Sequence, residues 1–182
     1  MSSIDAYLYY GALEDFRSLL NGPAPTLKAV RIRGEGYLGH AQSLPLYSPS
    51  FQDRFPALRT LWLEGYPSDL ARSVPVMANG LTKLVLYKRQ SHHLRDLLDY
   101  MEHCANLEHL KIELPGLHGT APASRVVSLP KSRELEFVRS TPAVFYHLSF
   151  PPSSDLTIQL GVMSYAQAEE YPLVDLWASP HI

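Results

Sequence analysis

The sequence predicts an α/β fold, a solenoid whose concave face is a curved parallel β-sheet and whose convex face consists of helices and irregular loops. Two observations support this. One short apolar pattern recurs five times along the chain, and an amphipathic helical stripe stands between two of its copies. Fifteen prolines in 182 residues add a third, because they indicate many short elements joined by turns.

The recurring pattern is a leucine, two residues, an apolar residue, one residue and a second apolar residue. It occurs as LKAVRI, LRTLWL, LTKLVL and LEHLKI, and in a degenerate form as SRELEF, with Ser132 in place of the first leucine. The central apolar residues are Val30, Leu61, Leu84, Leu110 and Leu135. Their numbers differ by 31, 23, 26 and 25, mostly within the roughly 20–29 residues of a leucine-rich repeat.

Each copy predicts a strand with one buried face. Because side chains alternate along a strand, Leu61 and Leu63 point into a shared core while Trp62 and Glu64 point away from it. One unit cannot bury its apolar face alone, but a stack can. Further strands are expected at residues 6–10 and 155–160, which gives about seven parallel strands.

The connections between strands are of two kinds. Helices are expected at residues 12–20, 91–106 and 140–150, with Ser91 and Thr141 as N-caps, Pro142 at a first helical position and Asn106 as a helix stop. The clearest helical stripe is formed by Leu94, Leu97, Leu98 and Met101. Residues 39–56 and 115–130 are rich in proline, glycine and serine and predict irregular connections.

These elements predict one leucine-rich-repeat solenoid of about six to seven units over residues 1–160. Residues 161–182 fit no repeat and are expected to form a C-terminal cap or a tail.

Composition excludes several classes. A formal net charge of −2 gives no basic footprint for nucleic acid, and no apolar run is long enough to span a bilayer. The N-terminus lacks the basic flank and apolar stretch of a signal peptide. A single cysteine, Cys104, excludes an internal disulfide framework, so a cytoplasmic or nuclear location is expected.

The glycines of VRIRGEGYLGH, Gly34, Gly36 and Gly39, have the G-x-G-x-x-G spacing of a dinucleotide site. The preceding strand alternates apolar and charged residues, however, whereas a dinucleotide-fold strand is apolar on both faces. Pro45 and Pro49 also oppose the helix that should hold the pyrophosphate. Turn glycines are therefore the preferred interpretation, and a nucleotide-dependent enzyme using these glycines remains a less favoured alternative.

No other motif predicts catalysis or a cofactor. The chain has no nucleophile elbow, P-loop or C-x-x-C pair. The dense group His92, His93, His103, Cys104 and His109 is a candidate metal site by residue type. His92 and His103 are separated by about 16 Å along a helix, too far to share an ion, so solvent-facing histidines are expected.

The predicted binding surface is the concave sheet, on which outward side chains of neighbouring strands form columns. The first expected column holds Arg31, Trp62, Val85, Lys111 and Glu136, and the second holds Arg33, Glu64, Tyr87, Glu113 and Val138. The candidate partner-binding residues are Arg31, Arg33, Trp62, Glu64, Tyr87, Lys111 and Glu113. Trp62 is the leading candidate, because an exposed tryptophan flanked by charges is typical of an interface hot spot, although packing against a loop is an equal alternative.

Several joined stretches resemble the leucine-rich-repeat regions of fungal F-box proteins, the basidiomycete families especially. They are LLNGPAPTLKAVRIRG, LTKLVLYKRQ with LRDLLDYMEHCANLEHLKIE, VVSLPKSRELEF, and VFYHLSFPPSSDLTIQL. Together they extend over roughly residues 12–160. The resemblance implies protein–protein recognition, as the substrate-recognition arm of a ubiquitin ligase receptor, with an unknown protein or peptide as ligand.

The F-box, the helical module that docks on a Skp-type adaptor in that family, is not found in this sequence, since the repeats begin within the first ten or twenty residues. Adaptor binding is therefore expected only if an F-box lies upstream. A stand-alone or truncated repeat protein without a ligase role is the alternative.

Overall fold

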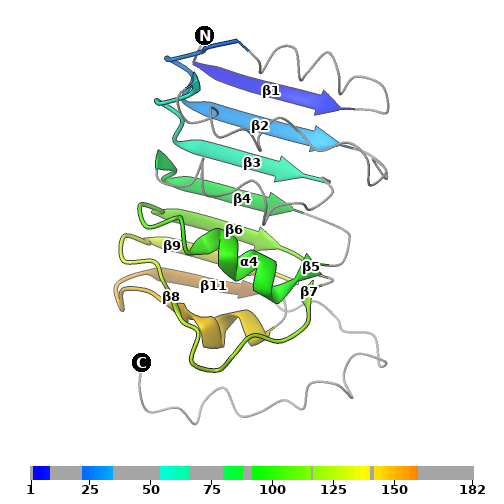
Figure 1. Cartoon of the computed structure of the whole chain (residues 1–182), viewed down its shortest axis with the longest axis vertical. Coiled ribbons are helices and arrows are strands. Elements are labelled where there is room, and N and C mark those ends of the chain that lie inside the picture. Colours follow the sequence, from blue (N-terminus) through cyan, green and yellow to red (C-terminus); the bar gives the residue numbers. More distant parts are fainter. Residues whose placement is uncertain are drawn as a thin grey trace.

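The computed structural model describes residues 2–8, 22–34, 54–65, 80–87, 92–115, 117–139 and 142–159 (Figure 1). Within these ranges one large sheet contains β1 (Ser3–Leu8), β2 (Ala29–Gly34), β3 (Thr60–Glu64), β4 (Lys83–Tyr87), β6 (His109–Glu113), β9 (Glu134–Val138) and β11 (Asp155–Gln159). The remaining strands are β5 (His92–His93), β7 (Leu117–His118), β8 (Val127–Ser128) and β10 (Leu148–Ser149). The helices are α4 (Leu94–Met101) and the 3₁₀ helix η3 (Pro142–His147).

The large sheet is parallel throughout, and its strands follow one another in chain order. The register aligns the repeat pattern: Val30 lies opposite Leu61, Leu61 opposite Leu84, and so on through the stack. The predicted solenoid-like stack of parallel strands is thereby confirmed. The first strand is displaced, however, because β1 occupies Ser3–Leu8 and not residues 6–10.

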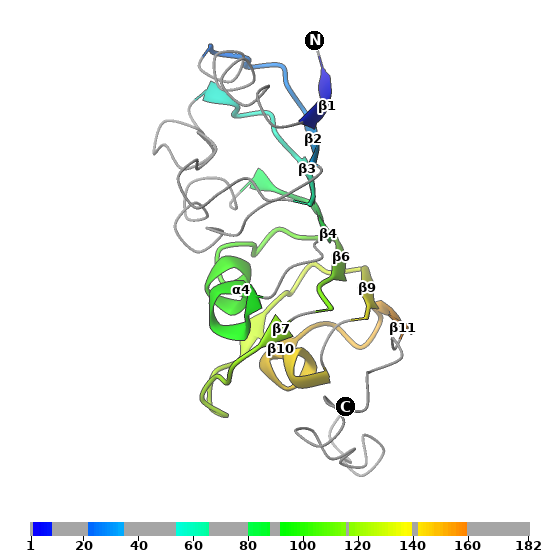
Figure 2. The same cartoon turned by 90° about the vertical axis from the view of Figure 1, so that its right-hand side faces the viewer.

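The sheet is curved, and its concave side is turned away from the helices (Figure 2). Both α4 and η3 lie on the opposite, convex side. The helices and short strands thus cover the face that carries the inward leucines, and they leave the concave face of the sheet uncovered.

The core lies between the sheet and the convex elements. The first leucine of each full copy is almost fully buried, from Leu27 at 0% exposed to Leu58 at 5%, because it enters the core from the turn that precedes the strand. The inward strand residues and the apolar side of α4 complete it: Val30, Ile32, Leu61, Leu63, Leu84, Leu86, Leu94, Leu97, Leu98, Met101, Leu110, Ile112, Leu135 and Phe137. Ser132, in the degenerate copy, is also buried, and its hydroxyl donates to the Leu129 carbonyl oxygen at 2.9 Å.

A repeated backbone turn places these first residues. The N–H of each donates to the carbonyl three residues earlier, in the pairs Leu27 to Ala24, Leu58 to Phe55, Leu107 to Cys104 and Ser132 to Leu129. A second ladder joins adjacent coils just before their strands, where Lys28, Arg59, Thr82, Glu108 and Arg133 each offer a carbonyl oxygen to the next coil. The turns therefore satisfy their backbone groups with one another.

The helical stripe at Leu94, Leu97, Leu98 and Met101 is confirmed in α4, where all four side chains are buried. The predicted ends of this helix were wrong. Ser91 is not the N-cap, because His92 and His93 pair with Leu117 and His118 in a short parallel ladder that keeps them extended. The helix then ends at Met101, several residues before Asn106.

Two other connections differ from expectation. Residues 142–147 form a 3₁₀ helix, and β10 follows it directly, so the helix expected over 140–150 is shorter and of a different type. The connection at 115–130 is irregular as predicted, but it contributes β7 and β8, and β8 pairs with β10. The helix expected at 12–20 and the tail at 161–182 lie outside the described residues.

Arg125 links the connection at residues 115–130 to α4. Its guanidinium donates to Asp99 at 2.5 Å and to Glu102 at 2.7 Å, and both carboxylates belong to the end of α4. Only 17% of the Arg125 side chain is exposed, so this three-residue cluster links the convex elements to one another.

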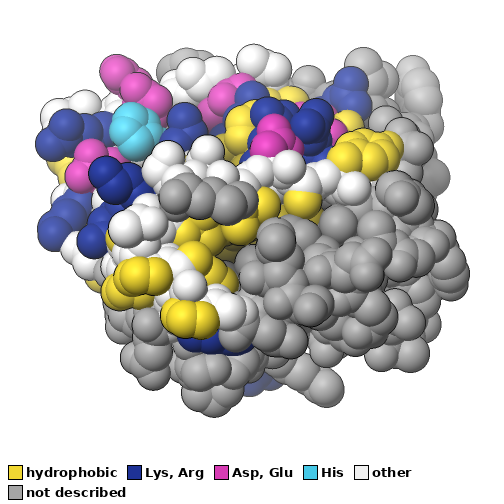
Figure 3. All heavy atoms as spheres, turned by 90° about the horizontal axis from the view of Figure 1, so that it is seen from above, with side chains coloured by type: hydrophobic (Ala, Val, Ile, Leu, Met, Phe, Trp, Pro, Cys, Tyr) yellow, Lys and Arg dark blue, Asp and Glu magenta, His cyan; other side chains and the backbone are white. Residues whose placement is uncertain are grey.

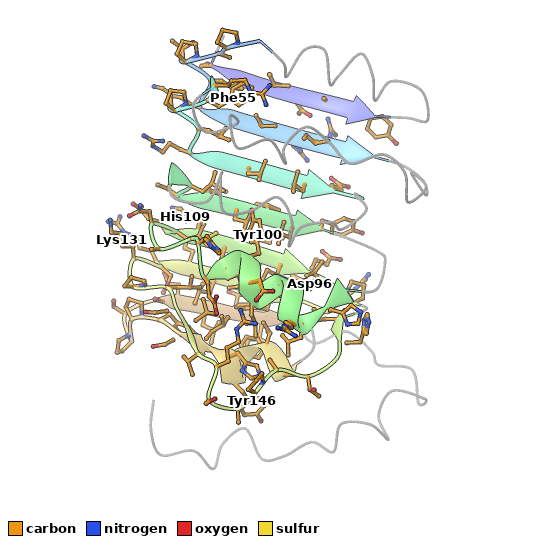
Figure 4. All side chains as sticks on the ribbon, viewed as in Figure 1. Phe55, Asp96, Tyr100, His109, Lys131 and Tyr146 are labelled. Atoms are coloured by element: carbon orange, nitrogen blue, oxygen red, sulfur yellow. The ribbon has the colours of Figure 1, made fainter. Side chains whose placement is uncertain are left out.

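Tyr100 points from α4 toward the sheet (Figure 4) and is 0% exposed. Its hydroxyl finds no hydrogen-bond partner among the described residues. Burial, together with the nearby Cys104, raises the pKa of this hydroxyl well above its ordinary value. An unpaired buried hydroxyl costs about 1–3 kcal/mol of desolvation.

Replacing Tyr100 by phenylalanine is therefore expected to raise the free energy of unfolding by about 1 kcal/mol. Tyr146→Phe is the matched control: Tyr146 lies on η3 with 57% of its surface exposed, so its hydroxyl is solvated and the change should be within about 0.5 kcal/mol. Urea unfolding followed by circular dichroism measures both. A destabilised Tyr100→Phe variant would show that the hydroxyl has an acceptor.

Among the described residues, no helix has both the length and the apolar character needed to cross a membrane.

Candidate functional site

The candidate site is the concave face of the large sheet, built from outward side chains in three columns. The central column contains Asp5, Arg31, Trp62, Val85, Lys111, Glu136 and Thr157. The second column contains Tyr7, Arg33, Glu64, Tyr87, Glu113, Val138 and Gln159, and the third contains Ser3, Ala29, Thr60, Lys83, His109, Glu134 and Asp155. Figure 3 shows charged side chains of both signs gathered along the upper margin of the molecule in that view, on the side of the sheet turned away from α4.

All seven predicted site residues lie on this face, in the two columns expected for them. They do not converge on a single point. Arg31, Arg33, Trp62 and Glu64 are together on β2 and β3, Tyr87 is one strand further on β4, and Lys111 and Glu113 are on β6. The face is therefore an extended strip, suited to a surface partner more than to a small molecule.

At the β6–β9 end, the charges are matched across adjacent strands. The Lys111 ammonium donates to the Glu136 carboxylate at 2.6 Å, and His109 Nδ1 lies 2.8 Å from Glu134 Oε2. Glu113 is 3.8 Å from the guanidinium of Arg139. Each of these carboxylates already has a local partner within the chain.

At the β1–β3 end, some side-chain N–H donors have no acceptor among the described residues. The Arg31 guanidinium carbon lies 3.9 Å from the centre of the Trp62 ring, a cation–π stack between residues at matched register. Arg33 donates from Nη2 to the Asp5 carboxylate at 3.0 Å. Yet Arg31 Nε, Arg33 Nε and Trp62 Nε1 are buried and find no acceptor among the described residues. Three adjacent N–H groups without acceptors are unusual, because buried donors are nearly always paired.

Sequence reasoning missed Asp5 and Lys83. Asp5 was missed because the first strand was expected three residues too late, which left residue 5 outside the sheet. Lys83 is exposed in the third column, two residues before Val85. Continuing the outward alternation of the strand toward the N-terminus would have revealed it. Val85 was expected on the outward face but is only 3% exposed. It does face outward, and the long side chains of Trp62 and Lys111 flank it in the same column.

Gly34 is the last residue of β2 and lies against Gly65, the residue that follows β3. Gly65 has φ +77°, and a Cβ atom there would overlap the carbonyl oxygen of Gly34. The contact explains why residue 65 is a glycine, because two coils approach closely there. Gly36 and Gly39, the other glycines of the spacing, lie outside the described residues.

The histidines and the cysteine are placed separately. His93 and His118 form a tilted ring pair with centroids 4.1 Å apart, His103 Nδ1 lies 2.9 Å from the Asp99 carbonyl oxygen, and His109 contacts Glu134. Cys104 is 0% exposed, and burial raises the pKa of its thiol to about 12, so at neutral pH it is a protonated core residue. No group of three or more metal-ligating side chains occurs in the described part of the chain.

Comparison with known proteins adds nothing to this description. No family model, curated protein or solved structure matches the chain. The columns on the concave face therefore carry the functional argument.

Proposed function

We propose that this chain is a protein-recognition module, a leucine-rich-repeat solenoid that binds a protein or peptide partner across the concave face. The observation that supports this most directly is the Arg31–Trp62 stack on this face, where Arg31 Nε, Arg33 Nε and Trp62 Nε1 find no acceptor among the described residues. Buried donors without acceptors are costly, so we infer that the Arg31–Trp62 group is retained for contacts with a partner and not for packing within the chain.

The curvature and the column arrangement support the same proposal. Neighbouring strands are about 4.8 Å apart, so the outward residues form continuous strips of charged and aromatic side chains on a rigid sheet. Tryptophan, tyrosine and arginine are the residue types enriched among interface hot spots, and the strip offers all three in Arg31, Trp62 and Tyr87.

The sequence resemblance supports a more specific role. We propose that the module is a substrate-recognition arm related to the F-box receptors of ubiquitin ligases, acting in the cytoplasm or nucleus. Its attachment to a Skp-type adaptor then depends on an F-box in the same polypeptide. Mapping the 5′ end of the native transcript tests this role: an upstream exon encoding an F-box supports it, and a transcript that starts at Met1 leaves a stand-alone recognition protein.

Binding across the concave face is tested by selecting 12-residue peptides from a random display library on the intact chain and measuring their affinities by fluorescence anisotropy. Replacing Trp62 and Tyr87 together by alanine is expected to weaken the selected peptides about tenfold or more, because hot-spot truncations cost about 2 kcal/mol or more.

Tyr146→Ala is the matched control, since Tyr146 is exposed on η3, on the convex side. It should leave the affinity unchanged, and circular dichroism melts establish that each variant is folded. Peptides that bind equally well to the Trp62/Tyr87 double variant would contradict recognition by the concave face.

A further inference from the structure

The guanidinium of Arg31 stands out among the charges of the concave face. It stacks on Trp62, the residue opposite it on β3, so its position is set before any partner binds. It forms no ion pair with a carboxylate of the described residues, and its Nε finds no acceptor among them. A fixed guanidinium that forms no ion pair with the described residues is prepared for an oxygen ligand at its Nη groups.

Other cations of the face are already matched. Arg33 is paired with Asp5, and Lys111 with Glu136. Binding an anion at either of these requires the local carboxylate to be displaced. Arg31 needs no such exchange. Lys83, exposed on β4 one strand beyond Trp62, likewise has no ion-pair partner in the described part of the chain.

The distribution of charge along the chain also favours an anionic ligand near Arg31. Residues 1–91 contain ten of the 16 lysines and arginines but seven of the 18 acidic residues, whereas residues 92–182 contain six and eleven. The β1–β4 half is therefore net positive and the other half net negative, although the whole chain is nearly neutral. An acidic ligand is attracted to the β1–β4 half and repelled from the remainder, which fixes where it docks.

We infer that Arg31, stacked on Trp62, is the site at which the concave face binds a carboxylate side chain of an acidic segment in its protein partner. This inference rests on the proposed recognition function and specifies the chemistry of the partner. The two Nη groups of the guanidinium can form an end-on fork that matches the two oxygens of a carboxylate, because Nε is buried and is not reached from outside. Trp62 fixes the plane of the fork, and Lys83 adds a second positive charge on the same side.

The test uses the full chain with fluorescein-labelled hexaglutamate as the probe and labelled hexaglutamine as its neutral counterpart. Affinities are measured by anisotropy at low and physiological salt. Hexaglutamate should bind more tightly than hexaglutamine, and Arg31→Gln should weaken it at least about tenfold. Arg133→Gln is the matched control, because it removes the same charge from a residue whose side chain is 74% exposed near the start of β9. It should change the affinity by less than about twofold.

Arg31→Lys keeps the charge but removes the planar fork, so intermediate binding is expected. This variant also keeps the test decisive if Arg31→Gln fails to fold. Equal weakening by Arg31→Gln and Arg133→Gln would overturn the site, because it would indicate general charge attraction. Stronger competition by a single-stranded oligonucleotide than by hexaglutamate would overturn the assignment to carboxylates.

Peptide selection separates failure of this inference from failure of the proposed function. Selected peptides that depend on Trp62 and Tyr87 but lack acidic residues and ignore Arg31→Gln would overturn the acidic partner while leaving recognition by the concave face in place. Peptides that are independent of Trp62 and Tyr87 would overturn the recognition surface itself.

Discussion

Replacing Gly65 by alanine is expected to lower the free energy of unfolding by about 3 kcal/mol or more. Two costs combine. The residue has φ +77°, a left-handed backbone conformation that costs an alanine roughly 1–2 kcal/mol. The new Cβ would also overlap the backbone oxygen of Gly34, and overpacking of this kind costs about 1–3 kcal/mol. The neighbour is backbone in a strand, so it cannot move aside as a flexible side chain would.

Gly22→Ala provides the control for this prediction. A Cβ at Gly22 meets no atom within 4 Å, and its backbone needs no left-handed conformation. Urea unfolding monitored by circular dichroism should place the midpoint of Gly65→Ala well below that of the natural chain and leave Gly22→Ala close to it. Equal midpoints for Gly65→Ala and the natural chain would mean that the coils do not approach each other as described.

Replacing Leu84 by alanine is expected to cost about 2–5 kcal/mol. Leu84 is 0% exposed at the centre of β4, between inward leucines of β3 and β6, so truncation removes apolar contacts and leaves a cavity that strands on both sides hold open. The measurement is the free energy of unfolding in urea, with the slope of the transition checked for two-state behaviour.

Leu156→Ala is a closely matched control. Leu156 occupies the same inward position on β11, since it lies opposite Leu135, which is aligned through Leu110 with Leu84. It is 43% exposed, however, so its truncation should cost less than about 1 kcal/mol. Similar costs at the two positions would contradict the described gradient of burial from the middle of the stack to its β11 end.

The stacked strands could be predicted because their signal is local and repeated. A leucine, two residues and an alternating apolar pair fix both the strand and its buried face, so β2, β3, β4, β6 and β9 lie where LKAVRI and its four counterparts predict them. Register follows from the same pattern, because parallel strands with equivalent inward residues align when those residues share one core. The columns of the concave face were predicted correctly for that reason.

The connections could not be predicted as well, because distant partners decide them. The start of α4 depends on the pairing of His92 and His93 with Leu117 and His118, a contact between segments that no local propensity reveals. The donors of Arg31 and Trp62 that lack an acceptor among the described residues could not be predicted either, since they depend on which side chains stack and which form hydrogen bonds. Alternation shows that a side chain faces outward, but not whether its hydrogen bonds are complete.

The uniform register also has an evolutionary consequence. Inward and outward positions alternate along every strand, so the exposed residues of the columns can be exchanged without altering the packing beneath them. Exposed substitutions of this kind typically change stability by no more than about 0.5 kcal/mol. A gene encoding such a sheet can therefore accumulate variation in what its product binds, one strand at a time, while selection for folding acts on a separate set of codons.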